Sequence, residues 1–371
     1  MRIFVASAPL LGHVFPMIPL ARALRDAGHE VLVATAGHGL AARRHDLPVE
    51  DIAPNLRFGR IAGRVLLGHP LIARAELAGE GGLRGLSRIF AAVNDEMADG
   101  AVALADRYEP DLVVHEPLAV FGALAAARRG APAVVHENSL FDPAELTRST
   151  AARLGKTFQR HGVPSLPASA GSMTISPTSV VGPRSGMPMR YEPVSVPGEI
   201  PDWLREPPRS CPRILVSRST VDGPWESPMV AAVTAAPEVD AEFVLVRPDD
   251  SIIGRELADN VRTVDWIPIN DVLPTCAGIV HHGGAGSIFG ALAGGTPQLM
   301  TPGAGDRKHN AQLVARRGAG LAVSARDIVA AHLKKLVEDP ALTAQAHEVR
   351  TEMAAMPAPE ELVPRLEKLA A

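Results

Sequence analysis

The stretch that decides the fold covers residues 264–313 and reads VDWIPINDVLPTCAGIVHHGGAGSIFGALAGGTPQLMTPGAGDRKHNAQL. Its centre is a short apolar run, residues 277–280, followed at once by the glycine-rich sequence His-His-Gly-Gly-Ala-Gly-Ser at residues 281–287. Residues 288–294 suit a short helix that stops at two glycines, with a proline beyond them. The stretch therefore predicts a strand, a glycine-rich turn and a helix.

A unit of this kind binds anions, because free backbone N–H groups and the positive end of the helix dipole point at one spot. Gly284 and Gly286 belong to the predicted turn, and Ser287 adds a hydroxyl at the predicted first position of the helix. His282, at the end of the strand, adds a ring N–H. Together these residues predict a site for a phosphate or diphosphate group.

Residues on either side of the turn indicate the class of ligand more closely. Trp266 and Ile267 lie upstream, and Asp306 lies downstream, just before another predicted helix. An aromatic ring, an anion site and a carboxylate, in this order, suit a nucleotide base, a diphosphate and a sugar. A Trp before a Pro is also common in protein cores, and that alternative stays open at this stage.

The rest of the chain alternates strands and helices. Residues 2–7, 15–27 and 29–35 read as strand, helix and strand, which begins a parallel sheet. A second alternation begins with a strand at residues 213–217 and leads through residues 261–264 into the central stretch. The first loop lacks the G-x-G-x-x-G pattern of dinucleotide-binding domains. The pattern predicts an α/β protein with two doubly wound, Rossmann-like domains.

The length of the chain also indicates two domains. A chain of 371 residues is too long for one ordinary domain. Proline-rich residues 199–212 predict a linker between domains at residues 1–198 and 213–356. Ligands of such sheets bind beyond the carboxyl ends of the strands. The site is therefore expected in a cleft between the two domains.

Composition limits the partners of the chain. A net charge of −4 gives no electrostatic reason to expect binding to nucleic acid or acidic membranes. No run approaches the ~18 apolar residues of a membrane span. The apolar N-terminus is interrupted at Gly12, His13 and Pro16, unlike a signal peptide, so a cytoplasmic protein is expected. Cys211 and Cys276 can form neither a disulfide framework nor a thiolate zinc site.

Three motifs together carry a resemblance to a known family. They are Trp-x-Pro at residues 266–268, His-x-Gly-Gly-x-Gly-Ser at residues 281–287, and Gly-His-x-x-Pro at residues 12–16. Over essentially its whole length the chain resembles the GT-B natural-product glycosyltransferases, especially the bacterial enzymes that modify antibiotics and enediynes. The resemblance implies an acceptor-binding first domain, a second domain that binds the nucleotide sugar, and a last helix from about residue 357 to 371 that crosses back onto the first domain.

The Gly-His loop of this family carries the catalytic base, which is His13 here. An imidazole base works better when a carboxylate orients it. Glu116, at the end of a predicted strand over residues 111–116, stands where the family often has an Asp for this task. Its longer side chain is a departure, so Asp111 and His115 remain alternatives. Without a catalytic role, His13 would cap the helix that follows it.

Four residues follow the first strand of the second domain, at a place where relatives read Gly-Ser or Gly-Thr: Ser217, Arg218, Ser219 and Thr220. Ser219 and Thr220 are expected to donate hydrogen bonds to the diphosphate. Arg218 replaces a small residue, and it either adds a charge for the diphosphate or is a solvated loop residue. In the same scheme Trp266, with Ile267 beside it, stacks on the pyrimidine.

Two departures from the family favour a deoxysugar donor. Plant relatives hold the ribose hydroxyls with a Glu three residues after the phosphate-binding Ser, and Gly290 stands at that position here. The absence of a carboxylate suits the 2′-deoxyribose of a dTDP-sugar. The Asp-Gln pair that binds sugar hydroxyls in many relatives is replaced by Asp306 and Arg307, and Arg cannot accept a hydrogen bond.

The expected function is inverting transfer of a sugar, in particular a deoxysugar, from a dTDP- or UDP-sugar to a hydrophobic natural-product aglycone. The acceptor is expected to contact residues 55–95 and 138–190. Two alternatives stay open: a sugar-nucleotide epimerase of the same fold, and a non-catalytic paralogue that binds nucleotide sugar or aglycone and assists a partner enzyme.

The nucleotide sugar is a co-substrate, and neither a metal nor another cofactor is expected. His281 and His282 are neighbours on a strand and so point to opposite faces, and no further ligands join them. The chain also lacks an Asp-x-Asp motif for a divalent cation. The expected partners are therefore small molecules, and a homodimer is left open.

Overall fold

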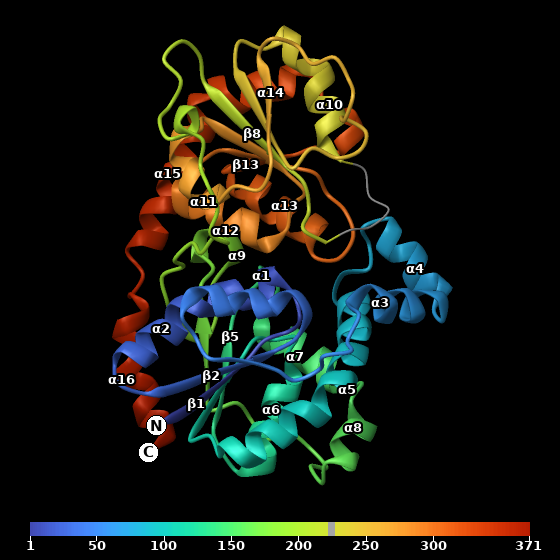
Figure 1. The fold of residues 1–371 in the computed structure, drawn as a ribbon, viewed down its shortest axis with the longest axis vertical. Coiled ribbons are helices and arrows are strands. Elements are labelled where there is room, and N and C mark those ends of the chain that lie inside the picture. The colour runs from blue at the N-terminus through green and yellow to red at the C-terminus, as the bar shows by residue number, and fades with distance from the viewer. Residues whose placement is uncertain (222–226) are drawn as a thin grey trace.

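Two parallel sheets, one in each half of the chain, organise the computed structural model, which describes residues 1–221 and 227–371 (Figure 1). In spatial order, the strands of the first sheet are β3 (Val49–Asp51), β2 (Glu30–Thr35), β1 (Arg2–Ala6), β4 (Leu112–His115), β5 (Ala133–His136), β6 (Gly171–Thr174) and β7 (Met187–Pro188). Those of the second sheet are β10 (Val261–Val264), β9 (Glu242–Val246), β8 (Arg213–Ser217), β11 (Gly278–His281), β12 (Gln298–Met300) and β13 (Gly320–Ala322). The predicted α/β class with two doubly wound sheets is confirmed.

The central strands of both sheets are buried because helices cover both faces. All four residues of β4 and of β11 are buried, which explains their nearly continuous apolar sequences. In the register of β1 with β4, Ala6 lies opposite His115. The loops that follow these two strands therefore start at the same edge of the first sheet.

The helices of the first half are α1 (Leu11–Val14), α2 (Ile18–Asp26), α3 (Phe58–Leu67), α4 (Pro70–Leu77), α5 (Gly82–Tyr108), α6 (Val120–Arg129), α7 (Pro143–Ala151), α8 (Gly155–Arg160) and α9 (Thr178–Val181). The single helix predicted at residues 15–27 is wrong in detail, because a 3-10 turn at Phe15–Met17 and α2 share this segment, and α1 ends just before it. Pro16 and Pro19, which lack a backbone N–H, interrupt the run. His13 therefore lies on a separate one-turn helix.

Residues 138–189, which the sequence pattern leaves without a predicted helix or strand, are not irregular. They contain α7, α8, β6, α9 and β7, none longer than nine residues. Elements this short show too few periods for a hydrophobic pattern to reveal them. Helix α5, by contrast, is long: it runs to Tyr108 and stops where Glu109 takes a left-handed conformation before Pro110.

The helices of the second half are α10 (Pro228–Ala235), α11 (Ile269–Val272), α12 (Ala285–Gly294), α13 (Arg307–Arg317), α14 (Ala330–Glu338) and α15 (Pro340–Ala354). Helix α12 begins three residues earlier than predicted, so Gly286 and Ser287 belong to its first turn. It ends as predicted, with Gly295 in the left-handed region at φ +68°. In the described parts of the chain, no helix is both long and apolar enough to cross a membrane.

The last helix, α16 (Pro359–Ala370), lies against α2 of the first half (Figure 1). Leu362 and Leu366 share a buried apolar cluster with Ile18 of α2. The two halves also meet directly, because the rings of Tyr191 and Phe289 stack with centroids 5.1 Å apart. The domain limits at residues 198, 212 and 356 stay predictions.

The contact between α6 and the first sheet can be tested at Gly122. A β-carbon there would lie 2.5 Å from Cβ of Ala6 and 2.8 Å from Cβ of His115. Gly122→Ala is expected to lower the free energy of unfolding by ~1–3 kcal/mol, because the helix must move away from the strands. Chemical denaturation measures this change.

Gly63→Ala on α3 is the matched control, since nothing lies within 4 Å of the added β-carbon. It is expected to match or exceed the wild type in stability, because Ala is the better helix former. Equal stability of the two variants would contradict this account of the packing.

Candidate functional site

A histidine and a buried carboxylate meet where β1 and β4 end. His13 lies on α1, and Glu116 directly follows β4; the distance from His13 Nδ1 to Glu116 Oε1 is 3.1 Å. The Glu116 side chain has no exposed surface, whereas 18% of the His13 side chain is exposed. One group of the pair thus stays in contact with solvent, and the other is fully enclosed.

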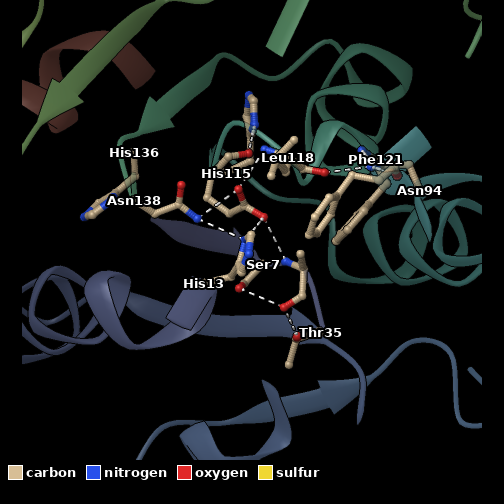
Figure 2. Close-up of polar contacts among 12 residues, drawn as sticks. Ser7, His13, Thr35, Asn94, His115, Leu118, Phe121, His136 and Asn138 are labelled. Atoms are coloured by element: carbon tan, nitrogen blue, oxygen red, sulfur yellow. Dashed lines mark hydrogen bonds and ion pairs between the residues drawn. The ribbon is translucent and has the colours of Figure 1, made fainter. Parts of the chain in front are cut away.

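Backbone and side-chain donors surround the carboxylate of Glu116. Of the residues around it, His13, Leu118 and Asn138 are labelled in Figure 2. The backbone N–H of Ala8 donates to Oε1 at 3.2 Å, and that of Leu118 donates to Oε2 at 2.7 Å. Asn138 donates to Oε2 from Nδ2 at 3.1 Å. Burying a carboxylate without hydrogen bonds lowers the stability of the folded chain, and these donors offset that cost. Because they make Glu116 an acceptor, His13 donates from Nδ1, and its Nε2 keeps a lone pair.

Further contacts hold the pair in place. The ring of His13 lies 5.1 Å, centroid to centroid, from that of Phe90 on α5. Asn94, one turn farther along α5, donates from Nδ2 to the carbonyls of Phe90 and Leu118, at 2.7 and 2.6 Å. It also accepts from the backbone N–H of Phe121 at 2.7 Å (Figure 2). The long helix α5 therefore fixes the loop that carries Glu116.

The two alternative partners of His13 lie elsewhere. Asp111 precedes β4 and accepts a hydrogen bond from the backbone N–H of Arg2, at the opposite edge of the sheet. His115 is buried and pairs through Nδ1 with the carbonyl of Glu116 at 3.0 Å, and burial lowers its pKa. Asn138 was not predicted. The available signal was that it follows β5, the strand next to β4.

In the second half, β11 ends at His281, so His282 is outside the strand, and the two rings lie edge to face with centroids 6.2 Å apart. The ring of His281 is buried: Nε2 lies 2.9 Å from Oε1 of Gln298, and Nδ1 accepts from the backbone N–H of Gly283 at 3.1 Å. Burial lowers its pKa to about 4, so the ring is neutral and shapes the turn.

The ring of His282 covers the start of α12. A β-carbon on Gly284 would lie 2.4 Å from Nε2 of His282, so the absence of a side chain there makes room for the ring. Burial, then the charge of Arg307 and the neighbouring His281, lowers the pKa of His282 well below its usual value. The neutral ring offers one N–H donor beside the helix terminus.

The first turn of α12 is open to a ligand. Gly284 is the N-cap residue, and no side chain caps the helix. A β-carbon on Gly286 would meet nothing within 4 Å. Ser287 is half-buried in the same turn. This is the geometry of an anion site at a helix N-terminus.

Arg307 brings a positive charge to this region. It is the first residue of α13, is 9% exposed, and donates from Nη2 to Oγ of Ser219 at 3.0 Å. The adjacent Asp306 accepts from Nδ2 of Asn310 at 2.8 Å, and that amide group also donates to the carbonyl of Gly283. Loops after β8, β11 and β12 therefore converge on one spot, and Asn310 is a contributor that was not predicted.

The remaining predicted donor residues spread around this spot. Trp266 is 37% exposed, so it is not a core residue, and the guanidinium of Arg247 lies 5.2 Å from its ring centroid. Ile267 is buried beneath it in an apolar cluster. The structure shows Ser217 buried at the end of β8, Arg218 half-buried and Thr220 exposed.

A cavity of about 330 Å³ lies between the two halves. Leu140, Phe141 and Arg184 line it from the first half, and His309 and Leu313 line it from α13. The rings of Phe141 and His309 are stacked, with centroids 4.2 Å apart. Within residues 1–221 and 227–371, no cluster of three His, Cys, Asp or Glu side chains could hold a metal ion.

Comparison with known proteins identifies the family. The model of the erythromycin biosynthesis protein CIII-like N-terminal domain matches residues 22–219, and that of the corresponding C-terminal domain matches residues 231–369. The chain belongs to this family of GT-B natural-product glycosyltransferases. The resemblance inferred from the three sequence motifs is confirmed, and so is the expectation of a transferase enzyme.

Three relatives illustrate the similarity. The elloramycin glycosyltransferase ElmGT of Streptomyces olivaceus is 34% identical, over 99% of this chain and 97% of the relative. The aclacinomycin-T 2-deoxy-L-fucose transferase of Streptomyces galilaeus is 31% identical, over 100% of this chain and 96% of the relative. The structure of glycosyltransferase SsfS6 from Streptomyces sp. SF2575, complexed with thymidine diphosphate, superimposes with a TM-score of 0.84 at 27% identity, covering 99% of each chain.

The buried histidines make stability depend on pH. Because the pKa of His281 is about 4 in the folded chain and about 6.5 in an unfolded one, protons bind the unfolded state more readily between these values. The free energy of unfolding is therefore expected to fall as the pH falls from about 6.5 towards 4. Denaturant titrations at pH 7 and pH 5 measure the fall.

His281→Gln should reduce this fall, because one of the buried imidazoles no longer titrates. His38→Gln removes an exposed histidine and serves as the control, with an unchanged fall. If the free energy of unfolding depended on pH in the same way in both variants, burial of His281 would not be the cause of the fall.

Proposed function

We propose that this enzyme transfers a deoxysugar from a dTDP-sugar to an apolar natural-product aglycone, with inversion at the anomeric carbon. The observation that carries the proposal is the pair of His13 and Glu116 in the first half, together with the uncapped N-terminus of α12 in the second half. Helix α1, which holds His13, lies on the side of the first half that faces α12 (Figure 1). Asn138 donates from Nδ2 to Oε2 of Glu116 at 3.1 Å, and Leu140, two residues on, has its carbonyl 3.4 Å from Nε2 of His309 on α13.

The pair supplies general-base catalysis. Nε2 of His13 takes the proton of the acceptor hydroxyl as the oxygen attacks the anomeric carbon. The bond from that carbon to the diphosphate oxygen breaks, and the nucleoside diphosphate leaves with the electron pair. Glu116 holds Nδ1–H and stabilises the imidazolium that forms. A single displacement without an enzyme nucleophile inverts the anomeric configuration.

The second half stabilises the leaving group. Backbone N–H groups of the first turn of α12, the hydroxyl of Ser287 and the neutral ring of His282 surround the position for the diphosphate. Arg307 adds a buried charge beside them. Arg307 is 9% exposed, so its hydrogen bonds to an anion would be shielded from solvent.

The preference for a dTDP-deoxysugar rests on packing and on relatives. A β-carbon on Gly290 would lie 2.3 Å from Oδ1 of Asn270, which itself is tied to the carbonyl of Val194 at 3.2 Å. No Glu fits there to hold ribose hydroxyls. SsfS6 was solved with thymidine diphosphate, and another relative is a 2-deoxy-L-fucose transferase.

The acceptor is assigned to the interdomain cavity. Its lining combines aromatic and aliphatic side chains with a few polar groups, which suits a bulky apolar molecule. The cavity uses residues 140–145 and 181–184, within the segment 138–190 that the sequence assigned to the acceptor. It also uses His309 and Leu313, so the second half contributes to this pocket.

His13→Ala tests the base. In assays with a panel of dTDP- and UDP-sugars and candidate aglycones, kcat is expected to fall about 10²–10⁴-fold, because the general base is removed. The Kd of thymidine diphosphate is expected to stay unchanged, because His13 lies outside the anion site. Glu116→Gln should lower kcat in the same direction, and His38→Ala should not.

Turnover by His13→Ala within tenfold of wild type would refute the role of the base. If the wild type binds thymidine diphosphate but turns over no sugar with any aglycone, a non-catalytic auxiliary role gains support instead.

Arg307→Ala tests the anion site. Calorimetry is expected to show thymidine diphosphate binding about 10–100-fold more weakly, because a charge-assisted contact to phosphate is lost. Thymidine, which has no phosphate, should bind as to the wild type, and this also verifies that the variant is folded. The control is Arg326→Ala, at an exposed arginine of the same half. If Arg307→Ala lost as much affinity for thymidine as for thymidine diphosphate, the assignment of Arg307 to the phosphate site would be contradicted.

A further inference from the structure

A corner of the first half reaches the donor side of the cleft. Helices α3 and α4 lie beside the start of α5, on the side of the first half that is towards the second half (Figure 1). The corner comprises residues 76–85, from the end of α4 to the first turn of α5. It contacts residues 303–308, the loop between β12 and α13 and the start of that helix.

The main contact is made by Glu76. Its Oε2 accepts a hydrogen bond from the backbone N–H of Gly305 at 2.9 Å. Only 6% of Glu76 is exposed, which is unusual for a carboxylic side chain. Gly305 directly precedes Asp306 and Arg307. One bond across the cleft therefore fixes the backbone just before the two residues assigned to the donor.

Two glycines make room for Glu76. A β-carbon on Gly81 would lie 1.8 Å from its Oε1, and one on Gly85 would lie 1.6 Å away. In the described parts of the chain, Oε1 has no hydrogen-bond partner. Burial and the nearby charge of Asp306 raise the pKa of Glu76, although the bond from Gly305 opposes the shift. A buried carboxyl of this kind costs stability, so its place here is not explained by packing.

The same corner makes two more contacts along the loop. A β-carbon on Gly79 would lie 2.9 Å from the carbonyl oxygen of Gly303, so the two backbones approach closely. Glu80 forms an ion pair with Lys308. The ion pair is largely exposed and therefore contributes little by itself. Of the three contacts, the one made by Glu76 is buried and directional.

We infer that Glu76 is a positioning residue for the donor sugar: its bond to Gly305 holds Asp306 and Arg307 in place. This inference rests on the proposed function. Glu76 acts through the loop and not through direct contact with the diphosphate or the reacting atoms. The corner of the first half thus helps to shape the sugar end of the donor site in the second half.

Hydrogen exchange tests the contact without any substrate. In Glu76→Ala, amides of residues 303–308 are expected to exchange about tenfold faster, because the bond to Gly305 is lost. Glu76→Gln keeps a carbonyl oxygen for Gly305 and should exchange at nearly the wild-type rate. The matched control is Glu96→Gln on α5, which only breaks an exposed pair with Arg64. Unchanged exchange in Glu76→Ala would overturn the inference.

Kinetics then test the consequence. With the dTDP-sugar that the wild type turns over fastest, Glu76→Ala is expected to lose about tenfold in kcat/KM, and Glu76→Gln at most threefold. The Kd of thymidine diphosphate should stay within twofold for both, because the diphosphate site lies outside the contact. Equal losses of thymidine diphosphate affinity and of kcat/KM would show a merely structural role and overturn the inference.

The two hypotheses fail in different ways. If the wild type turns over no nucleotide sugar, the proposed function fails, and the exchange of residues 303–308 still decides whether Glu76 holds the loop. If the wild type is active and Glu76→Ala matches it in kcat/KM, only the inference about Glu76 fails.

Discussion

The catalytic edge of the first half depends on one buried carboxylate. Glu116 accepts from Ala8 after β1, from Leu118 after β4 and from Asn138 after β5, and it orients His13. Without these bonds a carboxylate in this position would be strongly unfavourable. The same group therefore gathers three loops at the carboxyl edge of the sheet and sets which nitrogen of His13 faces solvent.

The second half has the opposite arrangement, because among its described residues a cationic side chain and not a carboxylate is buried. Burial keeps His281 and His282 neutral, so the positive charge near the helix terminus comes from Arg307 and the helix dipole. A neutral imidazole donates one hydrogen bond without adding a second buried charge beside the guanidinium.

Several contacts connect the two halves of the chain. Stacked rings of Phe141 and His309, the packing of α16 on α2, and the bond from Gly305 to Glu76 tie the halves together at separate points. The first and the last of these points reach α13 and the loop before it, and the second lies at the C-terminal helix.

The sequence by itself determined the two parallel sheets and the glycine turn before α12, and it reduced the candidate partners of His13 to Glu116, Asp111 and His115. These features follow from local patterns: apolar strands, glycines that stop helices, and polar residues at the ends of adjacent strands. Tertiary structure alone decided the contacts of Asn138 with His13, Arg307 with Ser219, and Glu76 with Gly305. Each of these contacts joins residues from segments far apart in the chain. The periodicity and spacing of the sequence do not predict such contacts, because they depend on how the folded elements pack.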